Sequence, residues 1–94
     1  MEKIHLKLYV TGHTSRSVKA ITNLREFCVK NFGQEFRLEI IDVLENPEAA
    51  EQEKILATPT LIKLLPPPMQ RLIGDLSDQH KIIVSLDIKE FSNQ

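Results

Sequence analysis

Several residue types are scarce in this sequence of 94 residues, and each scarcity argues against a class of protein. Cys28 is the one cysteine, so no internal disulfide can form and a cytoplasmic location is expected. There is no tryptophan, and the basic residues are not interleaved with aromatic ones, which argues against nucleic-acid binding. The 12 basic and 13 acidic residues nearly balance, so the chain has no general attraction to nucleic acid or to an anionic membrane.

Long apolar segments are also absent. No apolar run approaches the roughly 20 residues that a membrane-spanning helix needs. The N-terminal segment "MEKIHLKLYV" alternates apolar and polar residues, unlike the apolar core of a signal peptide. No repeat or linker is visible. We therefore expect a single domain over residues 1–94 that does not enter a membrane.

The usual patterns of catalytic and cofactor sites are missing as well. There is no glycine-rich phosphate loop, so no nucleotide or other cofactor is expected. The histidines His5, His13 and His80 are too scattered to predict a metal site by spacing. His13 and Ser15 share one turn, but no acid that would orient the histidine is evident. The sequence thus predicts a protein that is not an enzyme.

The first half of the chain predicts a strand, a helix and a second strand. Apolar residues recur at every second position of residues 4–10, which favours a strand. Gly12 allows a turn in front of a helix, and Thr14 or Ser15 can cap that helix. Gly33 is a natural end for this helix. Apolar residues again occupy every second position at Phe36, Leu38 and Ile40, which favours a second strand. This order indicates a βαβ unit with parallel strands. The expected apolar stripe of the helix is Val18, Ile21, Leu24, Cys28 and Phe32.

A short second helix is expected over 47–55. Asn46 suits the N-cap position, and Pro47 suits the first helical position, where its missing N–H costs nothing. Glu48 and Glu51 favour the positive end of the helix dipole.

The stretch "ATPTLIKLLPPPMQRLIGDLS", residues 57–77, has two self-consistent interpretations. In the first, the prolines form a turn between two strands, and a helix over 77–90 follows, capped by Ser77. Its apolar face would contain Ile82, Ile83, Leu86 and Phe91. In the second, the prolines open a helix that Gly74 ends, and "KIIVSLDI" is a strand. Local propensity alone does not separate the two.

Short motifs in one order along the chain resemble a known family. They are "LKLYVTG" (6–12), "SV" (17–18), "IDVLENPE" (41–48), "KILATPTLIKLLPPP" (54–68) and "IGDLSD" (73–78). On these residues the chain resembles the KaiB family of circadian clock proteins. The order of the motifs in the distal half of the chain is also similar to that in thioredoxin-like proteins.

The resemblance implies an α/β fold with two possible states. KaiB proteins are metamorphic: one state is a thioredoxin-like monomer, βαβαββα, and the other is a ground-state tetramer, βαββααβ. The two interpretations of the distal half match these states, as expected for a fold switch. The resemblance implies a cis bond at Thr58–Pro59, and the switch-sensitive positions that it carries over are Thr58, Pro59, Pro67, Ser85 and Asp87.

Departures from the family favour the thioredoxin-like state. Clock members commonly carry glycine at the position of Ser85, and serine is the better helix residue by roughly half a kcal/mol. The chain stops at Gln94 without the acidic C-terminal extension of those members. Glu39 stands where they often carry lysine. We interpret the chain as a divergent member.

The function implied by the resemblance is docking. The thioredoxin-like form would bind the N-terminal ATPase ring of a KaiC-like hexamer, displace a sensor histidine kinase and recruit KaiA, and so modulate the hexamer's phosphorylation cycle and output. Lysines and one arginine at matching positions would form the docking surface: Lys7, Lys19, Lys54, Lys63 and Arg71.

A redox or stress-response role is the alternative on a thioredoxin-like scaffold. Thiol–disulfide exchange usually needs two thiols at C-x-x-C spacing, and here Thr14 and Ser17 have that spacing with hydroxyls instead. Cys28 lies on the apolar stripe, where a small core residue is the simpler interpretation.

Overall fold

A computed structural model describes residues 3–74 and 76–88 of the chain. Its elements follow the order βαβαββα, as the first of the two interpretations predicts. They are β1 (Ile4–Val10), α1 (Ser15–Phe32), β2 (Phe36–Asp42), α2 (Pro47–Gln52), β3 (Thr60–Leu65), β4 (Gln70–Ile73) and α3 (Gln79–Ser85). The fold is thioredoxin-like, and the alternative order βαββααβ is not the one that this structure adopts.

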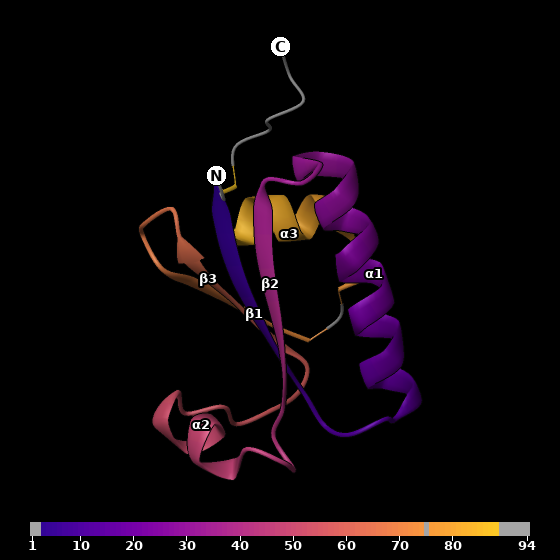
Figure 1. The fold of residues 1–94 in the computed structure, drawn as a ribbon, viewed down its shortest axis with the longest axis vertical. Coiled ribbons are helices and arrows are strands. Elements are labelled where there is room, and N and C mark those ends of the chain that lie inside the picture. The colour runs from indigo at the N-terminus through magenta and orange to yellow at the C-terminus, as the bar shows by residue number, and fades with distance from the viewer. Residues whose placement is uncertain (1–2, 75, 89–94) are drawn as a thin grey trace.

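One four-stranded sheet organises the molecule, with the strands in the order β2-β1-β3-β4. β1 and β2 are parallel, as the βαβ prediction requires, whereas β3 runs antiparallel to both β1 and β4. α1 packs near β2 and α3 near β4 on the same side of the sheet (Figure 1). We call this side the covered face and the opposite side the open face.

The hydrophobic core lies between the covered face and these two helices. β1 contributes alternate side chains, which are all buried, and α1 and α3 contribute the residues that pack on them. The rings of Phe27 and Phe32 meet edge to face, with centroids 5.7 Å apart. The core residues of β1, α1 and α3 are Ile4, Leu6, Leu8, Val10, Ala20, Leu24, Phe27, Cys28, Phe32 and Ile82.

The buried stripe of α1 differs from the predicted one at its start. Val18 is exposed, so its inclusion in the stripe was wrong, and Ser17 is buried in its place. Adjacent helical residues differ in direction by about 100°, so only one of these two can face the sheet. The cap was predicted correctly, because the Thr14 hydroxyl accepts a hydrogen bond of 3.1 Å from the Ser17 N–H.

α2 is shorter than the predicted span of 47–55. It ends at Gln52 because Lys54 adopts a left-handed conformation with φ of 54°. The N–H of Ile55 then reaches back to the carbonyl of Ala50 at 2.9 Å, which closes a Schellman motif. Asn46 occupies the N-cap position, but its side chain makes no capping bond and donates instead to the Asp42 carbonyl.

The three prolines at 66–68 form the bend between β3 and β4. This confirms the hairpin interpretation, and the helix that the second interpretation placed here was wrong for this structure. The Thr58–Pro59 bond is cis, as the resemblance implies, and the Leu65–Pro66 and Pro67–Pro68 bonds are cis as well. Pro67 itself is exposed in the bend.

α3 is also shorter than predicted. Asp78, not Ser77, is its N-cap, because the Asp78 carboxylate accepts from the Lys81 N–H at 3.2 Å. The helix ends with Ser85, since Asp87 takes a left-handed φ of 53° and the Ile88 N–H bonds to the Ile83 carbonyl. Ile82 and Leu86 are buried as predicted. The predicted contribution of Phe91 lies outside the described residues.

Candidate partner-binding face

The turn that would hold the thiols of a thioredoxin holds hydroxyls that bond to one another. The Thr14 hydroxyl donates to the Ser17 hydroxyl at 3.0 Å, and Ser17 donates in turn to the Thr11 carbonyl at 3.0 Å. The Thr11 hydroxyl lies 2.6 Å from that of Thr58, next to the cis proline. These hydroxyls therefore tie the start of α1 to the segment before β3 and leave no thiol chemistry at this place.

Cys28 does not replace the missing thiols. Its side chain is 0% exposed, and burial raises the pKa of its thiol to about 12. The thiolate, which is the nucleophile in exchange reactions, is therefore almost absent at neutral pH. The structure supports the interpretation of Cys28 as a small core residue. Among residues 3–74 and 76–88, no group of three or more metal-ligating side chains is placed to hold a metal ion.

We predict that Cys28 does not react in the folded protein. Its pKa of about 12 leaves roughly a thousandfold less thiolate than an ordinary thiol has at the same pH, and the sulfur is also out of solvent. Dithionitrobenzoate should modify the native protein at least ~100-fold more slowly than the guanidinium-unfolded protein, and insulin reduction should be absent. Insulin-reducing activity that disappears in Cys28→Ser would contradict this prediction.

Asp42 holds the loops at the end of β1 and β2 together. Its Oδ1 atom accepts from the Gly12 N–H at 3.0 Å and from the Leu44 N–H at 2.9 Å. These two backbone bonds to the ionised form hold the pKa of Asp42 below its usual range. Gly12 takes a left-handed φ of 55°, which brings its N–H to the carboxylate without the strain that a side chain would add.

The lowered pKa of Asp42 predicts a pH dependence of stability. Because the pKa is lower in the folded state, the carboxylate stabilises the fold fully above its unfolded pKa of about 3.9 and loses this effect as the pH falls through the folded pKa. Asp42→Asn should therefore flatten the loss of stability below pH ~4, measured by urea unfolding at several pH values. If the free energy of unfolding falls equally steeply with decreasing pH in Asp42→Asn and in the wild type, Asp42 is not the group responsible. Glu45→Gln, at an exposed position, serves as the control.

Pairing across the sheet puts three charged residues in one row on the open face. Lys7 of β1 pairs with Glu39 of β2 on one side and with Ile62 of β3 on the other, and Ile62 pairs with Arg71 of β4. Directly paired residues point to the same side of a sheet. Two of the predicted docking residues, Lys7 and Arg71, therefore share the open face, separated by the buried Ile62.

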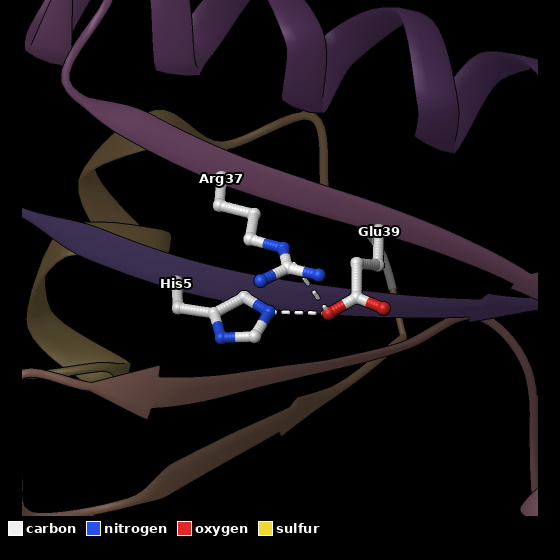
Figure 2. Close-up of polar contacts among 3 residues, drawn as sticks. All are labelled: His5, Arg37 and Glu39. Carbon is white, nitrogen blue, oxygen red and sulfur yellow. Dashed lines mark hydrogen bonds and ion pairs between the residues drawn. The ribbon is translucent and has the colours of Figure 1, made fainter. Parts of the chain in front are cut away.

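A second charged group stands beside Lys7. His5 of β1 donates a hydrogen bond from Nε2 to Oε2 of Glu39, and the Arg37 guanidinium lies 3.7 Å from the same oxygen (Figure 2). The hydrogen bond from His5 is the main reason why the pKa of Glu39 is lowered. His5 and Arg37 were not predicted as parts of this face, although the period-two alternation of both strands signals that they lie on it.

Arg71 brings Lys54 to the same face. Its Nη2 donates to the Glu53 carbonyl at 2.8 Å and its Nη1 to the Lys54 carbonyl at 3.3 Å. The Glu53 carboxylate lies 3.8 Å from the guanidinium as well. The guanidinium thereby fixes the turn after α2 against β4. Lys54, whose side chain is exposed, is joined to Arg71 through its backbone carbonyl.

The other two predicted docking residues lie elsewhere. Lys63 is 1% exposed: it pairs with Leu6 on the covered face, and its Nζ donates to the Asp87 carbonyl at 3.5 Å. Its ammonium is thus enclosed at the end of α3. Lys19 is exposed, but it belongs to α1 on the covered side. The five predicted residues therefore do not form one surface in this structure.

Apolar side chains at the proline hairpin are unusually exposed. Leu65, Met69 and Ile73 have exposed fractions of 54%, 59% and 52%. Leu65 pairs with His5 of β1. Ile73 pairs with Thr60 of β3, which in turn pairs with Tyr9 of β1. Because His5 and Tyr9 are on the open face, Leu65 and Ile73 point to the open face as well. We call these three residues the hairpin patch. Exposed apolar residues grouped beside polar ones are typical of interaction surfaces.

Comparisons with known proteins identify what the chain is similar to. The family model described as the KaiB domain matches residues 7–88. The circadian clock protein KaiB3 of Synechocystis sp. is 53% identical over 88 residues, which cover 94% of this chain and 86% of that protein. The circadian clock oscillator protein KaiB of Prochlorococcus marinus is 54% identical over 83 residues, covering 88% of this chain and 71% of that protein.

The solved structures with similar folds include a domain of the protein SasA and several thioredoxins. The solution structure of the N-terminal domain of Synechococcus elongatus SasA superposes with a TM-score of 0.75 at 24% identity, covering 96% of this chain and 89% of that one. At this identity, the likeness shows the fold alone.

Proposed function

The chain belongs to the KaiB family of circadian clock proteins, and on that premise we propose that it is a non-catalytic binding protein that docks on the N-terminal ATPase ring of a KaiC-like hexamer. One observation carries the proposal for this chain. The thioredoxin-like scaffold has hydroxyls at the turn where redox chemistry needs a reactive thiolate, and its one thiol, Cys28, is buried in the core. Its open face and hairpin edge carry exposed charged and apolar residues, among them Arg71, Leu65 and Ile73.

We place the docking surface on the open face and its hairpin edge. It comprises Lys7, Lys54 and Arg71 together with the hairpin patch. Apolar side chains supply buried area at such an interface, and rim charges raise the association rate and select the partner. Lys63 is not part of this surface because its ammonium is enclosed at the C-terminal end of α3. Lys19 would contribute only if the partner also wraps around α1.

The proposed consequence of docking is control of the hexamer's output. A thioredoxin-like sensor domain of a histidine kinase has the same shape and can compete for the same ring, whereas KaiA would be recruited to the docked protein. We propose that the protein docks as a monomer in the state described here. Thr58, Pro59, Pro67, Ser85 and Asp87 would influence the balance between this state and the tetrameric one without touching the partner.

Co-elution with a KaiC hexamer in its ATP-hydrolysing, phosphomimetic state tests the proposal. We expect the 10.8-kDa chain to move into the hexamer peak in size-exclusion chromatography and to be displaced by an excess of a thioredoxin-like kinase sensor domain. Failure to co-elute under ATP, ADP and nucleotide-free conditions alike would overturn it. A thioredoxin that has the same fold and a C-x-x-C motif is the matched negative control.

A further inference from the structure

A cavity of about 360 Å³ opens on the covered side of the molecule, between α1 and the cis proline Pro59. Three of its walls come from distant segments: the first turns of α1, the residue before β3, and the chain that leads into α3. The size falls at the lower end of the range for small-molecule sites. It is separate from the docking surface, which lies on the open face.

Buried apolar residues line the deeper part of this cavity. Ala20 is 4% exposed, Leu76 is 2% exposed, and Pro59 is buried as well. Each comes from a different segment. The Ser17 hydroxyl of α1 donates to the Thr11 carbonyl, and the Thr11 hydroxyl bonds to that of Thr58 before the cis proline, so α1 and the cis proline loop are fixed to each other through Thr11. The apolar surface is thus pre-formed, and a ligand that covers it must have a hydrocarbon part.

The entrance of the cavity is positively charged. Arg16 and Lys19 lie three residues apart on α1, line the cavity and are both exposed. Neither makes an ion pair within the described part of the chain, and no described acidic residue lines the cavity. Asn23 and Ser77, which are polar but uncharged, line the same cavity. Two cations near one opening favour the binding of an anion that carries either two singly charged groups or one doubly charged group.

We propose that this cavity binds a small organic dianion, either a dicarboxylate or a phosphate monoester, whose hydrocarbon part covers Ala20, Pro59 and Leu76. Arg16 and Lys19 bind the charged groups. Arginine offers a planar pair of N–H donors to either a carboxylate or a phosphate, and lysine contributes a point charge. Because the cavity lies on the covered side, a bound dianion leaves the open face accessible, and the proposal stands independently of the docking function.

Amide NMR titration of the isotopically labelled protein tests the proposal with two probes, glutarate and glycerol 3-phosphate. We expect at least one probe to give saturable shifts at Ala20 and Leu76 with a Kd below ~1 mM. Arg16→Ser combined with Lys19→Ser should raise that Kd at least ~10-fold, because each charged hydrogen bond contributes on this scale. The probe that binds more tightly distinguishes the carboxylate from the phosphate ester.

A matched pair of substitutions separates a built site from general attraction. Arg25→Ser combined with Lys30→Ser changes the net charge equally on the same helix, at residues that do not line the cavity, and should alter the Kd less than ~2-fold. Sodium sulfate should bind more weakly than the better organic probe. Shifts that do not saturate, equal weakening by both pairs, or equal binding of sulfate would each overturn the proposal.

Discussion

Lys63→Glu is expected to lower the free energy of unfolding by about 3 kcal/mol or more, because it places a carboxylate where the structure encloses an ammonium. The Lys63 side chain lies on the covered face, and its Nζ donates to the carbonyl of Asp87 at the C-terminal end of α3. The helix dipole and this carbonyl both favour a cation there and repel an anion. The midpoint of thermal unfolding should fall by more than ~12 °C.

Lys63→Met separates the charge of Lys63 from its packing. Methionine keeps the long apolar stem and removes the ammonium, so we expect a cost of less than ~1.5 kcal/mol. Docking to the hexamer should survive in this variant. If Lys63→Glu leaves thermal stability unchanged but Lys63→Met abolishes docking, the ammonium must be accessible to the partner, and the structural assignment of Lys63 would be wrong.

The combined variant Lys7→Glu and Lys54→Glu is expected to weaken docking on a KaiC-like hexamer by ~100-fold or more. Both residues belong to the proposed docking surface, and reversing charges at an interface costs several kcal/mol because like charges then face each other. Arg71 is left intact because its guanidinium holds the Glu53 and Lys54 carbonyls, so its replacement would also disturb the turn after α2.

Surface plasmon resonance against immobilised hexamer measures this effect. Much of the loss should appear in the association rate and should shrink at high salt, as expected for rim charges. Arg25→Glu combined with Lys30→Glu makes the same change of charge on α1 and should alter the Kd less than ~3-fold. Equal losses in the two variants would show that net charge, and not the open face, governs docking.

The parts of the fold that the sequence predicts well are those with a local signal. Ile4, Leu6, Leu8 and Val10 recur with period two, and this pattern gives the strand, its bounds and the side that faces the helices. It gives no sign that Tyr9 is buried on the opposite side. Gly33 and Thr14 mark the two ends of α1 through cap chemistry that acts within a few residues. Residues 57–77 carry no local signal that decides between a hairpin and a helix. Their hairpin depends on the pairing of β3 with β1 and on the Leu61–Leu72 pair at the core.

The side of the sheet on which each charged residue lies was predicted less well, for a related reason. The sequence identifies lysines but not their side of the sheet, and lysine is usually exposed, so Lys63 was expected at the surface. The register of β1 and β3 shifts between His5 and Leu6, so that Lys63 pairs with Leu6 and Leu65 pairs with His5. The side chains of Lys63 and Leu65 therefore point to opposite faces of the sheet. Such a bulge leaves no clear mark in the sequence. The bond between His5 and Glu39 likewise joins two strands that are far apart along the chain.

Backbone carbon chemical shifts of residues 79–85 in the free protein test the thioredoxin-like account most directly. The structure predicts helical Cα shifts over Gln79–Ser85 and strand shifts over Thr60–Leu65 and Gln70–Ile73. Strand shifts at 79–85 together with helical shifts over 66–73 would contradict it, because the chain would then adopt the alternative order βαββααβ and the open face described here would not exist.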